Sequence, residues 1–374
     1  MSGPPAAARF RPTVAVVDLE ATRHNVRTMK PPGAQLMAVV KADAYGHGDV
    51  PVARAALEAG ATWLGVALVE EGIALRDAGI DAPILVLSEL PRGSEKDALA
   101  AGLTPTVYTG AGATLVGEAA RASGGPGRVH LKIDTGMHRV GADPDEAVDL
   151  AAAVASQGLD LEAVWTHLAR ADEPDQPSAR EQMDRFAGTL SDLAAAGFRP
   201  RIRHAANSAA AIAMPEAHLD LVRVGIAMYG IAPGPELGGR VDLRPAMSLR
   251  SQVSAVRRVG AGEGVSYGHR YRPDRSSTIA TAPVGYADGY ARALSNRGHV
   301  LIRGRRYPVA GTVTMDQLMV DCGDDPVEPG DEVVLFGKQD GAEIRAEEVA
   351  DWAGTIGYEV VTAVSHRVPR EHRG

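Results

Sequence analysis

The stretch LMAVV (36–40) opens a pattern that recurs through the first two-thirds of the chain. Similar apolar runs follow at TWLGVAL (62–68), PILVL (83–87), TPTVY (104–108), VHLKI (129–133), LEAVW (161–165), RIRHA (201–205) and LDLVRV (219–224). Segments with helical spacing, such as EEGIALRDAG (70–79) and REQMDRFAGTLSDLAAAG (180–197), lie between them. Strands that alternate with helices predict a parallel sheet. Eight such strands favour a closed (β/α)8 barrel, and an open doubly wound sheet is the alternative.

The alternation of strand-like and helix-like segments ends near Arg244 and Pro245. Short β-like runs such as HVLIRG (299–304) and DEVVLFG (331–337) follow, separated by Gly, Pro and Asp. We therefore predict an α/β chain with an N-terminal (β/α)8 TIM-like barrel over residues 10–243 and a mostly-β domain over 244–374. The run TVAVVDL (13–19) could pack with either domain.

Composition narrows the class of protein. The chain has 374 residues, of which 45% are hydrophobic and 23% charged, as is ordinary for globular proteins. A net charge of −8 disfavours general nucleic-acid binding, and no apolar stretch is long enough to predict a membrane span. Cys322 is the single cysteine, which fits a reducing, cytoplasmic location. No metal-binding motif stands out, so no metal site is expected.

Basic side chains follow several of the predicted strands. Lys41 comes after the first run, Lys132 lies in the fifth with Arg139 beyond it, His167 follows the sixth and Arg223 lies in the eighth. In a barrel these strand ends meet at one mouth, where catalytic groups gather. Such a mouth should attract an anion. Each residue taken alone also suits a plainer role, as a solvated lysine, a hydrogen-bonded core histidine or an ion-paired arginine.

Asn207 and Ser208 follow the seventh run and precede a helical segment. This position suits a helix cap, and the free N–H groups of a helix start also suit a phosphate.

The segment AVVKADAYGHG (38–48) strongly resembles the pyridoxal-phosphate lysine segment of the alanine racemase family. Further resemblances follow in order along the chain: LKIDTGMHRVG (131–141), WTHLARAD (165–172), HAANSAA (204–210), VRVGIAMYG (222–230), GVSYG (264–268), VGYADGY (284–290), GTVTMDQ (311–317) and IGYEVVT (356–362). The family fold is an α/β barrel followed by a β domain, in agreement with the pattern above.

The resemblance implies a role for each residue that matches. Lys41 would bind pyridoxal 5′-phosphate and act as one base, and Tyr267 would be the second base on the opposite face of the substrate. His167 would link Tyr267 toward Arg223, which would face the pyridine nitrogen. The remaining implied roles are cofactor contacts at Tyr45, Asn207, Ser208, Gly225, Ile226 and Tyr358, substrate contacts at Arg139 and Met315, carbamylation of Lys132, and a substrate access path at Asp172, Tyr286 and Arg292.

The family also implies a function and a partner. The expected reaction is interconversion of L- and D-alanine for peptidoglycan synthesis, in a homodimer with shared active sites. A racemase with broader preference, for example for serine, is an alternative because Leu168 and Thr314 depart from residues common in the family. A barrel-type pyridoxal-phosphate decarboxylase is disfavoured by the arginine at the pyridine nitrogen and by the VSYG tyrosine. A cofactor-binding protein made of a barrel alone is disfavoured by the second domain.

Overall fold

A computed structural model describes residues 10–124 and 127–374. The chain divides into two compact units. The barrel unit is Leu19–Arg244, and the β unit combines residues 10–18 with Pro245–Gly374. Each unit is described separately.

Eight parallel strands form the centre of the barrel unit, in the order β8-β7-β6-β5-β4-β3-β2-β9. They are β2 (Gln35–Val39), β3 (Trp63–Val66), β4 (Ile84–Glu89), β5 (Thr104–Val107), β6 (Arg128–Lys132), β7 (Asp160–Trp165), β8 (Ile202–His204) and β9 (Leu221–Val224). Backbone hydrogen bonds from Asp220 N to Arg203 O (3.1 Å) and from Arg223 N to Ala206 O (3.0 Å) join the two ends of this series. The predicted barrel is confirmed, and the open sheet was the wrong alternative.

The strands bury both of their faces, which explains their nearly continuous apolar sequences. Met37 and Trp63 belong to one buried cluster with Leu85 and Leu221. The flanking residue Leu36 belongs to a separate, larger cluster that includes helical side chains. Since successive strand residues point to opposite faces, the smaller cluster fills the barrel and the larger one lies between strands and helices.

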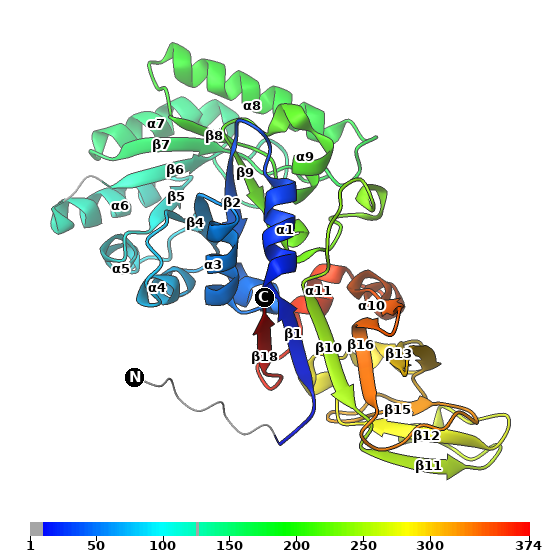
Figure 1. The fold of residues 1–374 in the computed structure, drawn as a ribbon. Coiled ribbons are helices and arrows are strands. Elements are labelled where there is room, and N and C mark those ends of the chain that lie inside the picture. Colours follow the sequence, from blue (N-terminus) through cyan, green and yellow to red (C-terminus); the bar gives the residue numbers. More distant parts are fainter. Residues whose placement is uncertain (1–9, 125–126) are drawn as a thin grey trace. The chain divides into compact units, whose positions relative to one another are not determined.

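Helices surround the strands (Figure 1). They are α1 (Leu19–Met29), α2 (Lys41–Gly46), α3 (Asp49–Glu58), α4 (Val69–Asp77), α5 (Glu95–Ala100), α6 (Gly110–Ser123), α7 (Ala147–Ser156), α8 (Ser178–Ala195) and α9 (Ser208–Ala213). In α8 the buried residues are Ala179, Gln182, Phe186, Thr189 and Leu193. This spacing of three and four residues places them on one helix face, which packs toward the barrel.

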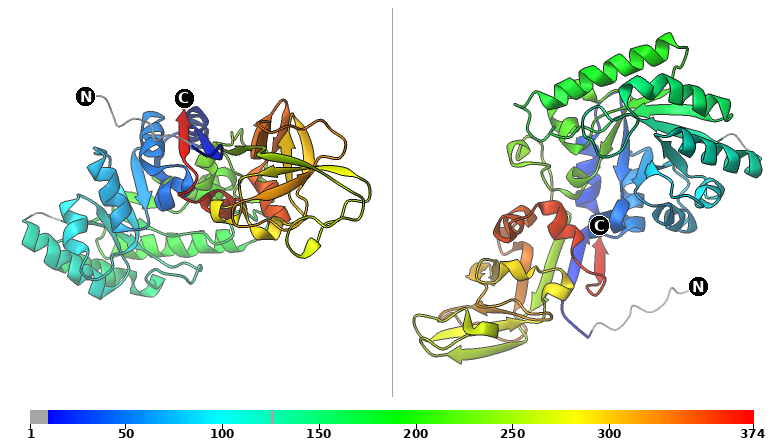
Figure 2. Two further views of the ribbon diagram at one scale, coloured as in Figure 1. Left: turned by 90° about the horizontal axis from the view of Figure 1, so that it is seen from below. Right: turned by 180° about the vertical axis from the view of Figure 1, so that it is seen from behind.

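The described part of the β unit contains two sheets, the α-helices α10 and α11, and several short 3-10 helices, and Figure 2 shows it from two further sides. The larger sheet has the order β14-β13-β16-β10-β1-β18, with β17 on β16, and the smaller has the order β11-β12-β15. The elements are β1 (Val14–Asp18), β10 (Met247–Gln252), β11 (Ala255–Val259), β12 (Ser277–Ala282), β13 (His299–Ile302), β14 (Arg305–Pro308), β15 (Leu318–Asp321), β16 (Glu332–Gln339), β17 (Ala342–Ile344), β18 (Arg370–Arg373), α10 (Ala346–Ala353) and α11 (Gly357–Thr362). Strand β1 pairs antiparallel with β10 and parallel with β18, so the run at 13–19 contributes to this sheet.

Candidate active site

Lys41 lies immediately beyond β2, at the mouth of the barrel, where the strands end. The next four residues, 42–45, have φ of 52–53° and ψ of 38–54°, which is a left-handed turn built without glycine. Each L-residue in this conformation costs about 1–2 kcal/mol. Such strain persists only where the surroundings impose it, and it concentrates at functional sites.

Three groups converge near this turn in a way that suits a phosphate. The Ser208 hydroxyl, at the start of α9, accepts hydrogen bonds from Gly225 N (2.9 Å) and Ala227 N (3.4 Å). A Cβ at Gly225 would lie 2.5 Å from the Tyr45 hydroxyl oxygen, so glycine is required for this close approach. Burial raises the pKa of Tyr45 to about 12, which keeps its hydroxyl a neutral donor. Ile226, the next residue after Gly225, is buried at the same place.

Asn207 forms two hydrogen bonds through its side chain, and the first makes it the predicted helix cap. Its Oδ1 accepts a hydrogen bond from Ala210 N (3.0 Å), so it caps helix α9. Its Nδ2 donates to the Leu168 carbonyl (3.0 Å), which ties the loop after β7 to the start of the same helix.

Arg223 is buried and donates hydrogen bonds to four acceptors. They are His204 Nδ1 (3.0 Å), Thr166 O (2.9 Å), Ala205 O (3.0 Å) and His167 Nδ1 (3.2 Å). Nη1 donates to His204, and the two hydrogens of Nη2 are shared among the other three acceptors. Because a guanidinium only donates, each imidazole accepts through an unprotonated Nδ1. Burial and then the charge of Arg223 hold the pKa of His167 and of His204 well below the ordinary value. Burial lowers the pKa of Arg223 to about 9, which leaves it charged at neutral pH.

A third histidine, His130, extends this network into the barrel. With its Nδ1 an acceptor, His204 carries its proton on Nε2, which lies 3.2 Å from His130 Nδ1. His130 then carries its proton on Nε2, 3.6 Å from Glu162 Oε2. The Trp165 ring stacks on His204 with a centroid separation of 5.4 Å and lies 4.7 Å from the Arg223 guanidinium carbon. The orientation of Arg223 is therefore determined by packing as well as by hydrogen bonds.

Cations gather at the mouth and act on one another. Burial, followed by the charges of Arg223 and Arg139, lowers the pKa of Lys132 to about 7. Its Nζ lies 4.5 Å from the centroid of the Trp165 ring. Burial and then Arg139 also lower the pKa of Lys41, while Glu71 acts in the opposite direction. The basic residues that follow the strands in sequence thus form one electropositive cluster in space.

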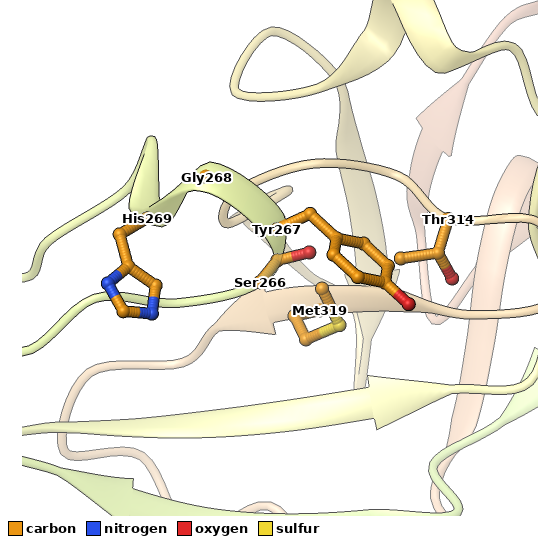
Figure 3. A pocket seen from close by; sticks show the side chains of 6 residues that line it. All are labelled: Ser266, Tyr267, Gly268, His269, Thr314 and Met319. Atoms are coloured by element: carbon orange, nitrogen blue, oxygen red, sulfur yellow. The ribbon is translucent and has the colours of Figure 1, made fainter.

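Tyr267 lies in a tight turn of the β unit, in the short helix η5 (Tyr267–His269). The Thr312 hydroxyl donates to the Tyr267 carbonyl (2.9 Å), and the Ser266 hydroxyl donates to the Thr312 carbonyl (2.7 Å). The side chain is 75% exposed and borders an open hollow of about 410 Å³. In Figure 3 its ring extends toward Thr314, and His269 lies at the other end of the turn. The residues lining the hollow are Ser266, Tyr267, Gly268, His269, Thr314 and Met319.

Met315 and Tyr286 lie on adjacent segments of the β unit. Backbone hydrogen bonds run from Tyr286 N to Thr314 O (3.0 Å) and from Ala287 N to Met315 O (3.1 Å). A Cβ at Gly285 would collide with the carbonyls of Thr314 and Met315, so glycine permits this approach. Both predicted site residues remain exposed, at 52% for Met315 and 42% for Tyr286.

The other predicted residues are divided between the units. Tyr358 lies in α11, and Arg292 begins the short helix η7 (Arg292–Leu294), both in the β unit. Asp172 lies in the loop after β7 of the barrel unit. The substrate access path and the contact of Tyr358 with a cofactor stay predictions.

Sequence reasoning missed residues that hold the predicted ones in place. His204 was not distinguished from an ordinary core histidine, although it receives a hydrogen bond from Arg223. Gln182 Nε2 donates to the His167 carbonyl (3.0 Å), and its Oε1 accepts from Ala169 N (2.9 Å). Its signal was an amide side chain on the buried face of α8, between Ala179 and Phe186. Glu71 gave no signal, because it resembles an ordinary acidic residue in the first turn of a helix.

Comparison with known proteins decides the family. A family model described as alanine racemase, N-terminal domain, matches residues 17–233, and one described as alanine racemase, C-terminal domain, matches residues 246–372. The chain belongs to the alanine racemase family. The resemblance and the prediction of an amino-acid racemase are confirmed at this level.

Curated relatives and solved structures agree with the family models over almost the whole chain. An alanine racemase of Symbiobacterium thermophilum is 52% identical over 369 residues, covering 98% of each chain. The alanine racemase structure from D-cycloserine-producing Streptomyces lavendulae has a TM-score of 0.94 at 44% identity, covering 98% of each chain. The Bacillus anthracis alanine racemase structure with bound L-Ala-P has a TM-score of 0.91 at 39% identity, covering 98% of this chain and 96% of that one.

Over residues 10–124 and 127–374, no cluster of three or more His, Cys, Asp or Glu has the arrangement of a metal site. Within the same ranges, no helix is long and apolar enough to cross a membrane.

Proposed function

We propose that this protein interconverts L- and D-alanine with pyridoxal 5′-phosphate. The observation that carries the proposal is the barrel mouth, where Lys41, Tyr45 and Ser208 lie together with the buried Arg223. Relatives named alanine racemase, at 45–52% identity over nearly their full length, support the same reaction.

The residues of the mouth fit this cofactor. Tyr45, Ser208 and the N–H groups of Gly225 and Ile226 would bind its phosphate, because neutral donors suit a phosphate at a helix start. Lys41 would bind its aldehyde carbon, helped by a lowered pKa that increases the fraction of neutral amine. When bound, the cofactor supplies an electron sink that acidifies the substrate α-proton.

We propose Lys41 and Tyr267 as the two bases, one for each face of the substrate. Lys41 Nζ takes or returns the α-proton on its face, and the Tyr267 phenol oxygen does so on the other. Arg139 and Met315 would bind the substrate carboxylate, with His167 and Arg223 behind the tyrosine. Tyr358 would add a phosphate contact, and Asp172, Tyr286 and Arg292 would border the access path.

Arg223 would donate a hydrogen bond to the pyridine nitrogen. Its charge and its four hydrogen bonds within the barrel leave it unable to accept one. The nitrogen would stay unprotonated, which weakens the electron sink and favours rapid return of the proton over side reactions.

Lys132 is proposed to be carbamylated. Its pKa of about 7 gives the neutral amine needed to attack carbon dioxide, with release of one proton. The product would be an anion among the cations of Arg139 and Arg223, where a lysine ammonium is disfavoured.

One incubation, with several readouts, tests this function. Incubation of the protein and pyridoxal phosphate with L-alanine, followed by separation of enantiomers, should yield D-alanine. Its absence would refute the proposal, while D-serine from L-serine at a comparable rate would favour the broader racemase. Release of carbon dioxide in place of inversion would favour the decarboxylase.

We further propose a homodimer with shared active sites, located in the cytoplasm and supplying D-alanine for peptidoglycan. The dimer is supported by the exposure of Tyr267 and Met315 in the β unit. Mixing Lys41→Ala with Tyr267→Phe subunits should restore part of the activity if sites are shared. No restoration would mean that each chain completes its own site.

A further inference from the structure

The Glu71 carboxylate, in the first turn of α4, joins two loops at the barrel mouth. One oxygen accepts a hydrogen bond from Ala42 N (2.7 Å). The other accepts from Ala67 N (2.8 Å) and Leu68 N (3.1 Å), in the loop after β3. Ala42 directly follows Lys41, so Glu71 holds the peptide unit that leaves the lysine. Ala42 is also the first residue of the left-handed turn, a conformation that the local sequence does not favour.

A second glutamate of the barrel, Glu89, also accepts hydrogen bonds from backbone amides and serves as a comparison for Glu71. Glu89, at the end of β4, accepts from Tyr108 N and Thr109 N at 2.9 Å each. No lysine precedes either amide, since Tyr108 follows Val107 and Thr109 follows Tyr108. Tying two mouth loops through a glutamate is therefore a structural device of this barrel. Glu71 differs because one of its amides belongs to the peptide bond of Lys41.

The charge of Glu71 is the second distinguishing feature. Burial and then the charge of Arg139 lower the pKa of the Lys41 amine, and the Glu71 carboxylate acts in the opposite direction. The charge of Lys41 in turn lowers the pKa of Lys132 and of His167. The Glu71 side chain thus fixes the backbone of the lysine and balances the field at its amine.

We propose that Glu71 is a positioning residue for Lys41, holding the peptide unit beyond the lysine and countering the cations around its amine. The inference rests on the proposed function, in which Lys41 binds the cofactor, and adds to it a residue that touches neither cofactor nor substrate.

The test follows two reactions of Lys41 in the cofactor-free full-length protein, read by peptide mass spectrometry. Reductive methylation with formaldehyde, run as a function of pH, reports the midpoint at which the amine loses its proton. Borohydride fixation of pyridoxal phosphate additionally requires the amine to be correctly placed. The variants are Glu71→Gln, Glu71→Ala and Glu71→Asp. Glu70→Gln is the matched control, since Glu70 is exposed, lies in the same helical turn and has no described polar partner.

In Glu71→Gln and Glu71→Ala the methylation midpoint should move to lower pH, because the opposing charge is gone. Fixation of pyridoxal phosphate above both midpoints should slow by about tenfold or more, the effect of losing a hydrogen bond to a charged group. Glu71→Asp should restore the midpoint while fixation stays slow, since the shorter side chain keeps the charge but not the reach. Glu70→Gln should match the unaltered protein in both reactions.

Any other combination overturns the proposal. A methylation midpoint that moves to higher pH would mean that the turn has opened to water and that Glu71 is only structural. An unchanged rate of pyridoxal-phosphate fixation would also mean that Glu71 does not position Lys41. If Glu71→Ala does not fold, as judged by circular dichroism, the Gln and Asp variants carry the test. Failure of the unaltered protein to fix pyridoxal phosphate on Lys41 would instead refute the proposed function, and the methylation midpoints would still judge Glu71.

Discussion

The buried imidazole of His204 should make the stability of the barrel unit depend on pH. Its side chain is fully buried, and burial, then Arg223 and His130, hold its pKa well below 6.5. In the unfolded chain its pKa returns to about 6.5. The contribution of His204 to stability is therefore fully present above pH 6.5 and is lost as the pH falls below it, because unfolding then takes up a proton. The loss is about 1.4 kcal/mol per pH unit, or about 2 kcal/mol between pH 7 and pH 5.

The variant His204→Asn isolates this effect. The asparagine Oδ1 can accept the hydrogen bond that Arg223 donates to Nδ1 (3.0 Å), but it does not titrate. At pH 7 the variant should be less stable by about 1–3 kcal/mol, because the hydrogen bond to His130 is lost. Between pH 7 and pH 5 it should lose about 2 kcal/mol less than the unaltered protein. The two stabilities should therefore approach each other as the solution is acidified.

Urea unfolding of the cofactor-free protein, followed by tryptophan fluorescence, measures this difference. Trp63 and Trp165 lie beside His130 and His204 in the barrel. A Trp352→Phe background removes the tryptophan of the other unit. The control is the same substitution at an exposed histidine of the same unit, His138→Asn, whose side chain is 84% exposed. Equal pH dependence of the unaltered and His204→Asn proteins would refute the reasoning.

Three further predictions concern Arg223, Tyr45 and Cys322. Arg223→Glu should lower racemisation and raise transamination, because the pyridine nitrogen could then be protonated; an unchanged ratio of D-alanine to pyruvate would contradict this. Tyr45→Phe should weaken pyridoxal-phosphate binding by about three- to tenfold, the value of one neutral hydrogen bond, and equilibrium titration measures it. Burial raises the pKa of Cys322 to about 12, so an aromatic disulfide reagent should label it only after unfolding, and Cys322→Ala should keep full activity.

The barrel could be predicted because each strand is marked by its own buried residues. The apolar run at 62–68 contains β3, and the run at 219–224 contains β9. Each strand differs from its apolar run only in where it begins or ends. Closure was less certain, since it depends on backbone hydrogen bonds between β8 and the segment around β9 that leave no mark in the sequence. The pattern gives the number of strands, and long-range pairing decides between barrel and open sheet.

The turn after Lys41 shows where local sequence fails. KADAY (41–45) contains alanines and no glycine, which by propensity favours a right-handed conformation. Its left-handed path is imposed by contacts distant in the sequence, including the hydrogen bond from Ala42 N to Glu71. Gln182 is a milder case, because a buried polar residue at an apolar position of α8 is a visible signal. Its partners, the His167 carbonyl and Ala169 N, appear only in the fold.

Arg223 only donates hydrogen bonds, and this property explains both the arrangement of the electropositive cluster and its preference for anions. A guanidinium can only donate, so His167 and His204 must accept and remain neutral, and the positive charge stays on Arg223. That charge, together with Arg139, lowers the pKa of Lys132 to about 7. The lowered pKa is itself a measure of electrostatic repulsion. Each anion that binds at the mouth relieves part of it. In the proposed function, a carboxylate near Arg139 and a carbamate on Lys132 would bring negative charge to these cations, which the carboxylates of Glu71 and Asp134 balance only in part.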